Sequence, residues 1–427
     1  MRDVIIVILV TVGVISAIRR PWVGVMYWTF FSIANPHTQT WGFAQSLPVA
    51  ASIAGATFLG MVFGRERRNP FLDPAVFSLL LFMVWIAIGW PFSFYPDESV
   101  EMLSKVLKVD LMVLVTVALV IKKEQIGWLV WVTVLSLAVY GVKGGLFTIA
   151  TGGSYRVWGP GGFIGGNNEV ALAFVIVIPL MYYLYETLTK KWWRRAMLAS
   201  MVLTAAAALG SHSRGALLAI VAMAIFLWWR SKNKMFLGAA LVVAGIVALA
   251  FMPDNWTSRM QTIQTYDKDE SAMGRINAWM MAWNLAADRP LTGGGFAIYE
   301  PAIFETYAPD PLDIHAAHSI YFQVLGEHGW VGFLIWLSIW WYTWRCARWL
   351  QRHGGRSPET AWCRSLGAMC QVSIVGYAVG GAFLSLAYFD LPYNVMIMVV
   401  TAKAWIQARE RTLTTTRVSD RPMGVSA

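Results

Sequence analysis

The amino-acid sequence predicts an all-α fold: a polytopic membrane helical bundle of about 12 transmembrane helices (12–13), with one large loop outside the cytoplasm. Three observations predict it. Apolar runs of roughly 17–22 residues recur along almost the whole chain, and each is long enough to cross the hydrocarbon layer as a helix. Hydrophobic residues make up 57% of the 427 residues and charged residues only 14%, about half the charged share of a soluble domain. Basic residues cluster at every second connection.

The runs are continuous rather than alternating, which selects helices over a membrane barrel. We expect them to form a single transmembrane domain, residues 1–427. The first two runs are short and Arg19-Arg20 separates them, so they form either two tilted spans or one half-inserted hairpin. This choice leaves the side of the N-terminus open. The expected spans lie at about residues 4–18, 22–35, 47–64, 74–94, 105–121, 127–149, 168–187, 196–211, 214–230, 235–252, 318–344, 366–387 and 391–408.

The orientation follows from the basic connections. They lie at residues 65–68, 122–123, 190–195, 230–234, 345–364 and from 409 onward, and the positive-inside rule assigns them to the cytoplasm. The segment 253–317 then lies on the opposite side. It holds nine acidic and four basic residues, whereas the whole chain has a net charge of +10. We therefore expect a large extracytoplasmic loop there, and a short, disordered cytoplasmic tail at 409–427.

The loop contains one predicted helix, at residues 274–287. Apolar Ile276, Trp279 and Trp283 recur at helical spacing, and Pro290 with the glycines that follow it ends the pattern. Such an amphipathic helix is expected to lie on the bundle or in the membrane interface.

Several classes of protein and site are excluded. No nucleic-acid-binding motif accompanies the positive charge, and no P-loop or dinucleotide fingerprint indicates a soluble nucleotide donor. Cys346, Cys363 and Cys370 lie in or near one cytoplasmic loop without zinc-type spacing, so neither a disulfide nor a zinc site is expected. The run at 4–18 precedes Arg19-Arg20-Pro21 and no small-residue cleavage site, which indicates a retained span.

Polar residues near the apolar layer are the informative ones, because ionisable groups are costly there and mark sites. Arg156 and Asn167-Asn168 flank a glycine-rich stretch at 159–166. Its backbone amides could approach an anion; the alternative is a flexible loop that leads into a helix. Arg214 follows Ser211-His212-Ser213 at the outer mouth of a helix hairpin. It is either an anion ligand or a snorkelling anchor.

The second group of candidates lies in and after the large loop. Arg275 begins the predicted helix, where a cation opposes the helix dipole; the alternative is an ordinary surface arginine. His315 and His318 precede a span and could share a helical face, but no carboxylate stands at the matching spacing, so we expect no metal. Ser319 follows directly. Glu327, nine positions beyond His318 on the opposite helix face, is expected to buttress neighbouring helices.

These candidates converge on one face of the membrane. Arginine donates two parallel hydrogen bonds to phosphate, and histidine can accept a proton at neutral pH. Together they predict a pocket for a phosphorylated, membrane-embedded substrate, with proton abstraction and departure of a phosphate.

Several motifs resemble the O-antigen ligase/polymerase superfamily. They are Ser213-Arg214-Gly215, Arg275…Trp283…Pro290-Leu291-Thr292-Gly293-Gly294-Gly295-Phe296, and Ala317-His318-Ser319…Leu325-Gly326-Glu327-His328-Gly329. Arg19-Arg20-Pro21-Trp22 and Arg156…Gly159-Pro160-Gly161…Asn167-Asn168 resemble the ligase branch in particular. The likeness extends over nearly the whole chain. Many members have Asn after the motif histidine, where this chain has Ser319, so the role of position 319 stays open.

The resemblance implies a metal-independent, cofactor-free, inverting glycosyltransferase of the bacterial inner membrane, active on the periplasmic face. Its fold would resemble the lipid-donor (GT-C) class, its donor would be a glycan on undecaprenyl diphosphate, and its acceptor a sugar hydroxyl of lipid A–core. His318 matches the general base, and Arg214 and Arg275 match the arginines that hold the diphosphate. Arg156 is a further diphosphate candidate from its position beside the glycine-rich loop. The supporting candidates are Asn167, Asn168, Ser319, His315 and Glu327.

Two alternatives remain at this point. Within the superfamily, an O-antigen polymerase or a protein O-oligosaccharyltransferase has similar motifs; the short basic tail mildly favours a lipid acceptor. Outside it, a lipid-linked glycan flippase would move a substrate without chemistry. Transporters place ionisable groups near the membrane midplane, whereas this chain gathers them at one surface.

Overall fold

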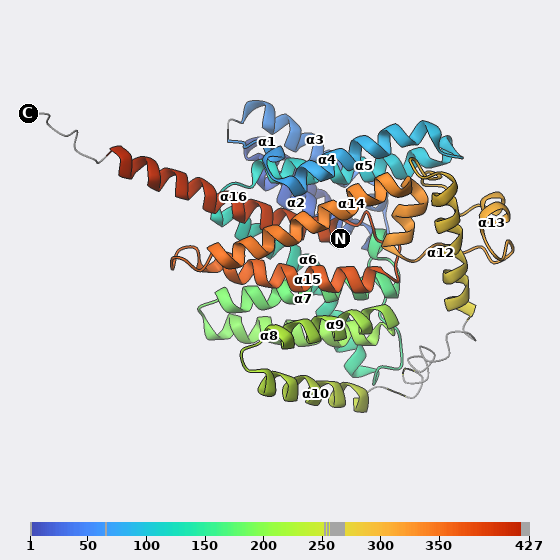
Figure 1. The fold of residues 1–427 in the computed structure, drawn as a ribbon. Helices are drawn as coiled ribbons and strands as arrows, with labels where there is room; N and C mark the ends of the chain where they lie inside the picture. The colour runs from blue at the N-terminus through green and yellow to red at the C-terminus, as the bar shows by residue number, and fades with distance from the viewer. Residues whose placement is uncertain (1, 65, 252, 254–255, 257–269, 420–427) are drawn as a thin grey trace, which may run out of the picture.

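The computed structural model describes residues 2–64, 66–251, 253, 256 and 270–419 (Figure 1). Across these residues the regular structure is helical, with no strand, which confirms the all-α prediction. The long helices are α1 (Arg2–Arg19), α2 (Pro21–Ala34), α3 (Val49–Phe63), α4 (Pro74–Gly89), α5 (Pro96–Leu119), α6 (Lys123–Ala150), α7 (Asn167–Thr187), α8 (Lys191–Gly210), α9 (Arg214–Arg230), α10 (Lys234–Phe251), α12 (Glu270–Asp288), α14 (Ile320–His353), α15 (Ala361–Gly381) and α16 (Asp390–Ser419). The short ones are η1 (Pro36–Gln39), η2 (Phe43–Ser46), η3 (Pro70–Leu72), η4 (Trp90–Phe92), η5 (Gly162–Ile164) and α13 (Pro301–Tyr307).

Three described helices are long and apolar enough to cross a membrane: Pro74–Phe92, Lys123–Ala150 and Asn167–Thr187. Val49–Phe63 and Lys234–Val247 are apolar but shorter. The other long helices do not meet the combined conditions of length, hydropathy and low charge. The count of 12 or 13 spans therefore stays a prediction, as does the likeness to the lipid-donor glycosyltransferase fold.

Most of the long helices run side by side, and α12 lies crosswise over their ends with α13 beside it (Figure 1). At the centre is α7, which packs against α6, α8, α9 and α15. Its residues from Val170 to Val177 are fully buried. A helix that is apolar on all sides belongs in the middle of a bundle, and the sequence of α7 is of this kind.

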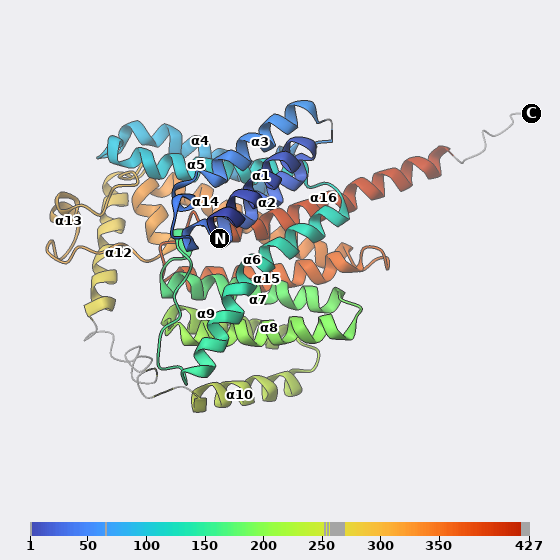
Figure 2. The same cartoon turned by 180° about the vertical axis from the view of Figure 1, so that it is seen from behind.

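The first two helices form a pair against α3, and Figure 2 shows them near α6. Small residues allow the close approach: a Cβ on Gly24 would lie 2.7 Å from Cβ of Ala17, and one on Gly60 would lie 2.4 Å from the carbonyl oxygen of Ala17. The start of α1 meets the connection before α3, because Asp3 Oδ1 accepts from the amide of Ala44 at 3.1 Å. The segment thus forms two helices, α1 and α2, and the choice between two tilted spans and one half-inserted hairpin stays a prediction.

The large loop differs from the prediction in detail. Its helix, expected at 274–287, is α12, and it starts earlier, at Glu270. Arg275 therefore lies in the second turn rather than at the first residue, and the expected opposition to the helix dipole is weaker than assumed. Residues 254–255 and 257–269 of the loop, and 420–427 of the predicted tail, lie outside the described residues. Helix α16 continues past residue 409, where the tail was expected to begin.

Candidate active site

His318 lies in the loop just before α14 and has an unusual backbone. Its φ is 42°, in the left-handed region that a side chain disfavours. Such strained residues persist only where their surroundings hold them, and they cluster at functional sites. Here the neighbouring carbonyl oxygen of Ala317 accepts a hydrogen bond from Trp279 Nε1 of α12 at 2.6 Å. Ser319, the N-cap residue of α14, is buried. The loop is fixed between the crosswise helix and the bundle.

Arg275 and His315 are neighbours of His318. The pKa of His318 is lowered to about 4, chiefly because the side chain is largely buried and to a smaller extent because Arg275 and His315 lie nearby. The ring of His315 packs over α12, since a Cβ on Gly274 would lie 2.7 Å from its Nδ1, and this Nδ1 lies 2.8 Å from Asp313 Oδ1. His318 is therefore a neutral imidazole at neutral pH, beside a fixed cation.

Arg214 begins α9, after the tight turn that joins α8 to α9. Three bonds hold this turn in place. Ser213 Oγ accepts from the amide of Ala216 at 3.2 Å, Asn167 Nδ2 donates to the carbonyl oxygen of Ser211 at 2.8 Å, and His212 Nε2 lies 2.8 Å from the carbonyl oxygen of Gly153. Asn167 thus positions the turn that presents Arg214.

The outer ends of α9 and α14 both pack against the same end of α15. A Cβ on Gly215 would lie 3.3 Å from Cβ of Phe383 just beyond α15, and one on Gly381 would lie 2.6 Å from Cδ1 of Ile320. Arg214 directly precedes Gly215, and His318 lies two residues before Ile320. The structure therefore brings Arg214, Arg275 and His318 to the same end of the bundle.

The glycine-rich loop is used mostly for packing within the protein. Its Pro160 carbonyl oxygen accepts from Thr38 Oγ1 at 2.6 Å and from Gln39 Nε2 at 3.0 Å. A Cβ on Gly159 would lie 1.5 Å from the carbonyl oxygen of Ile164, so glycine is required there by a close backbone approach. This close approach accounts for Gly159, and a role of the loop in binding an anion stays a prediction. Arg156 is exposed on the segment that leads to this loop, and Asn168 is partly exposed at the start of α7.

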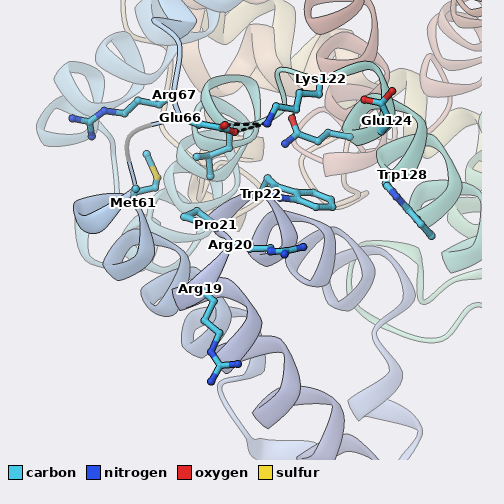
Figure 3. Close-up of a pocket in the computed structure, with 13 residues that line it drawn as sticks. Arg19, Arg20, Pro21, Trp22, Met61, Glu66, Arg67, Lys122, Glu124 and Trp128 are labelled. Carbon is cyan, nitrogen blue, oxygen red and sulfur yellow. Dashed lines mark hydrogen bonds and ion pairs between the residues drawn. The ribbon is translucent and has the colours of Figure 1, made fainter.

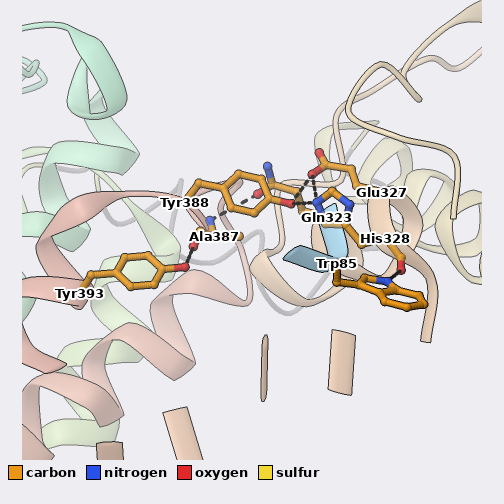
Figure 4. A network of polar contacts seen from close by, with 7 residues as sticks. All are labelled: Trp85, Gln323, Glu327, His328, Ala387, Tyr388 and Tyr393. Carbon is orange, nitrogen blue, oxygen red and sulfur yellow. Dashed lines mark hydrogen bonds and ion pairs between the residues drawn. The ribbon is translucent and has the colours of Figure 1, made fainter. Parts of the chain in front are cut away.

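Glu327 belongs to a buried network and not to the loop of His318 (Figure 4). Tyr388 is its centre: the hydroxyl donates to Glu327 Oε2 and lies 2.8 Å from His328 Nε2. Gln323, one turn before Glu327, accepts from the amide of Ala387 at 3.4 Å. The network ties α14 to the segment that follows α15. His328 and Tyr388 were missed in the sequence; Tyr388 gave no signal, because only the fold brings it to α14.

The two glycine motifs of the large loop and α14 are docked on each other. Helix α14 breaks at Gly329, where φ is 65°. The amides of Gly294 and Gly295 donate to the carbonyl oxygens of Gly326 and Glu327, respectively, both at 2.9 Å. The amide of Trp330 donates to the carbonyl oxygen of Pro290 at 2.8 Å. The stretch 290–295 therefore supplies the partners that an unbroken helix would supply itself, and fixes the break.

Arg19-Arg20-Pro21-Trp22 lies far from this site. These residues line a cavity of about 570 Å³ together with Arg67 and Lys122, and Figure 3 shows Lys122 bonded to Glu66 there. Lys122 precedes α6, whose other end leads to Gly153 beside His212. The motif is therefore at the opposite, basic end of the bundle. The start of α1 consequently lies at the end that holds His318.

Among the described residues, no three His, Cys, Asp or Glu side chains gather as metal ligands. Residues 199–337 match a family model described as O-antigen ligase, and residues 1–189 match one described as a family of unknown function (DUF5935). No curated protein matches the chain. The first match covers Arg214, Arg275, the docked glycine motifs and His318, and the apolar helices agree with a membrane protein. Residues 199–337, which carry these motifs, therefore match the O-antigen ligase family, and this match supports the O-antigen ligase/polymerase superfamily.

Proposed function

We propose that the protein is an O-antigen ligase of the bacterial inner membrane. It would transfer a glycan from undecaprenyl diphosphate to a sugar hydroxyl of lipid A–core on the periplasmic face. The observation that carries the proposal is the placement of His318, a neutral imidazole in a strained loop, next to Arg275 and at the same end as Arg214. The family implies a lipid-linked glycan and lipid A–core as partners in general.

The proposed reaction needs one base and one anion site. His318 accepts the proton of the acceptor hydroxyl, and the freed oxygen attacks the anomeric carbon of the donor sugar. The bond between that carbon and the diphosphate oxygen breaks, and its electron pair leaves with the lipid diphosphate. Arg214 and Arg275 stabilise the negative charge that develops on the leaving group. A single direct displacement inverts the anomeric centre and needs no covalent intermediate.

The low pKa of His318 fits this sequence of events. Above pH about 4 the free site holds the imidazole neutral, so the base is ready to accept a proton. A bound diphosphate brings negative charge close to Arg275 and His318. That charge offsets the effect of the guanidinium and favours the imidazolium that forms during the reaction.

The test is complementation of cells that lack their own ligase. Wild type should restore the ladder of long glycans on lipopolysaccharide, whereas His318→Ala and Arg214→Ala should leave bare core at equal membrane levels. His353→Ala is the matched control, because His353 ends α14 at the far end and stacks on Trp349. A normal ladder with His318→Ala would refute the general base. If wild type attaches nothing but restores chain length to a polymerase-deficient strain, the protein is the polymerase.

A further inference from the structure

A second candidate site lies at the end of the bundle away from His318. It is a groove of about 700 Å³ between α7, α8, α9, α10 and α15. Its lining includes Met201 of α8 and Met223 of α9. Met369 and Phe226 add to the apolar lining. Flexible methionine side chains suit a binding surface for an irregular apolar chain.

The groove runs from the middle of the bundle to one end. On α9 it extends from Met223 to Arg230, and on α15 from Val372 to Ala361. At 1.5 Å per residue these stretches are roughly 10 and 16 Å long. Half of a hydrocarbon layer is roughly 15 Å. The length of the groove along the helices is therefore close to the thickness of one membrane leaflet. This length suits a lipid acyl chain rather than a segment that crosses the whole membrane.

Positive charge surrounds the mouth of the groove. Arg230 and Arg364 line it, against one acid, Glu186, whose carboxylate already accepts from the Ser365 hydroxyl. Arg230 is held by Gln351 and Gln371, with its guanidinium 5.4 Å from the ring centre of Phe226. The basic connections 190–195 and 230–234 adjoin the same end. Basic pockets between helices on this side of a membrane suit anionic lipid headgroups.

We propose that this groove binds an anionic phospholipid of the cytoplasmic leaflet. The phosphate lies between Arg230 and Arg364, and one acyl chain lies along the methionines between α8 and α9. The site is separate from that of His318, and the proposal does not depend on the proposed function.

The test is native mass spectrometry of the purified full chain in neutral detergent. Phosphatidylglycerol and phosphatidylcholine with identical acyl chains are added in equal amounts. Wild type should retain phosphatidylglycerol preferentially, and Arg230→Gln/Arg364→Gln should weaken this retention roughly tenfold or more. Arg352→Gln, an exposed arginine on α14 outside the groove, is the matched control and should bind as wild type does. Because Arg230 also bonds two glutamines, Arg364→Gln alone, at an exposed position, is measured too.

A second variant tests the apolar part. Ala368→Phe fills the groove and should reduce retention of both lipids, while a tryptophan-fluorescence melting curve reports that the fold is intact. Equal binding of the two lipids by wild type would overturn the proposal. So would unchanged binding by both arginine variants, or an Ala368→Phe protein that changes oligomeric state without changing lipid retention, because the groove would then be a protein interface.

Discussion

Gly293→Ala is the sharpest test of the docked motifs. Gly293 has φ of 63°, and a Cβ there would lie 2.6 Å from both the carbonyl oxygen of Gly326 and the amide nitrogen of Gly329. Both contacts are with backbone, which has no other rotamer to adopt. Gly152 provides a matched control, because its φ is 58° and a Cβ would meet nothing within 4 Å. The two variants share the conformational penalty and differ in the clash.

The magnitudes follow from these contacts. A left-handed backbone with a Cβ costs roughly 1–2 kcal/mol, and both variants bear that loss. In Gly293→Ala the chain must also move away from α14, which weakens the three backbone bonds between 290–295 and the break. Each such bond contributes about 0.5–1.5 kcal/mol. The variant at Gly293 should therefore lose about 1.5–4.5 kcal/mol more than the one at Gly152.

The assay is denaturation of each purified variant in the same detergent, followed by tryptophan fluorescence, with lipopolysaccharide gels as the activity readout. Gly293→Ala should lower the melting temperature well below that of Gly152→Ala and abolish the glycan ladder, since the break positions the first part of α14. Equal stability of the two variants would refute the reasoning, because the docked loop would then contribute nothing to the folded state.

Three further measurements test the site. Wild-type kcat/KM should stay level as the pH falls until it nears 4, because His318 is neutral above its pKa of about 4. Arg275→Gln should shift the acidic side of this pH profile to higher pH, since the lost positive charge no longer disfavours the imidazolium. A wild-type profile that already falls off near pH 6.5 would contradict this. Tyr388→Phe should lower the free energy of unfolding by about 1–3 kcal/mol more than Tyr393→Phe, because it removes the hydroxyl at the centre of the buried network. Tyr393, the matched control, donates its hydroxyl to the carbonyl oxygen of Ala387 and does not contact Glu327. Equal melting temperatures of the two variants would refute this. Arg214→Lys should give glycan transfer between that of wild type and Arg214→Gln, because lysine keeps the charge but loses the planar fork; full activity of the Gln variant would exclude a role in binding the diphosphate.

Local patterns predicted the local structure. The apolar spacing of Ile276, Trp279 and Trp283 indicated a helix that α12 contains, and the short turn before Arg214 follows from the distance between two apolar runs. The superfamily was also readable, because its motifs keep their order along the chain and the family match confirms it.

Long-range contacts were not predictable in this way. Leu325-Gly326-Glu327-His328-Gly329 reads as part of one helix, and the break at Gly329 depends on partners some thirty-five residues away in the stretch 290–295. The glycine-rich loop at 159–166 has the composition of an anion cradle, yet its tight turns serve contacts with Thr38 and Gln39. Composition indicates which conformations a backbone segment can adopt, but only the fold shows which residues contact that segment.

Because α14 breaks at Gly329, the side chains before and after the break do not share one continuous helical rotation. In an unbroken helix each inserted residue turns everything beyond it by about 100°, so a change in length within the bundle would rotate the end that leads to His318. Because the stretch 290–295 fixes the chain at Gly329, the direction of His318 is set by that local docking. The part of α14 after the break can therefore change in length, to suit bilayers of different thickness, without re-aiming the imidazole.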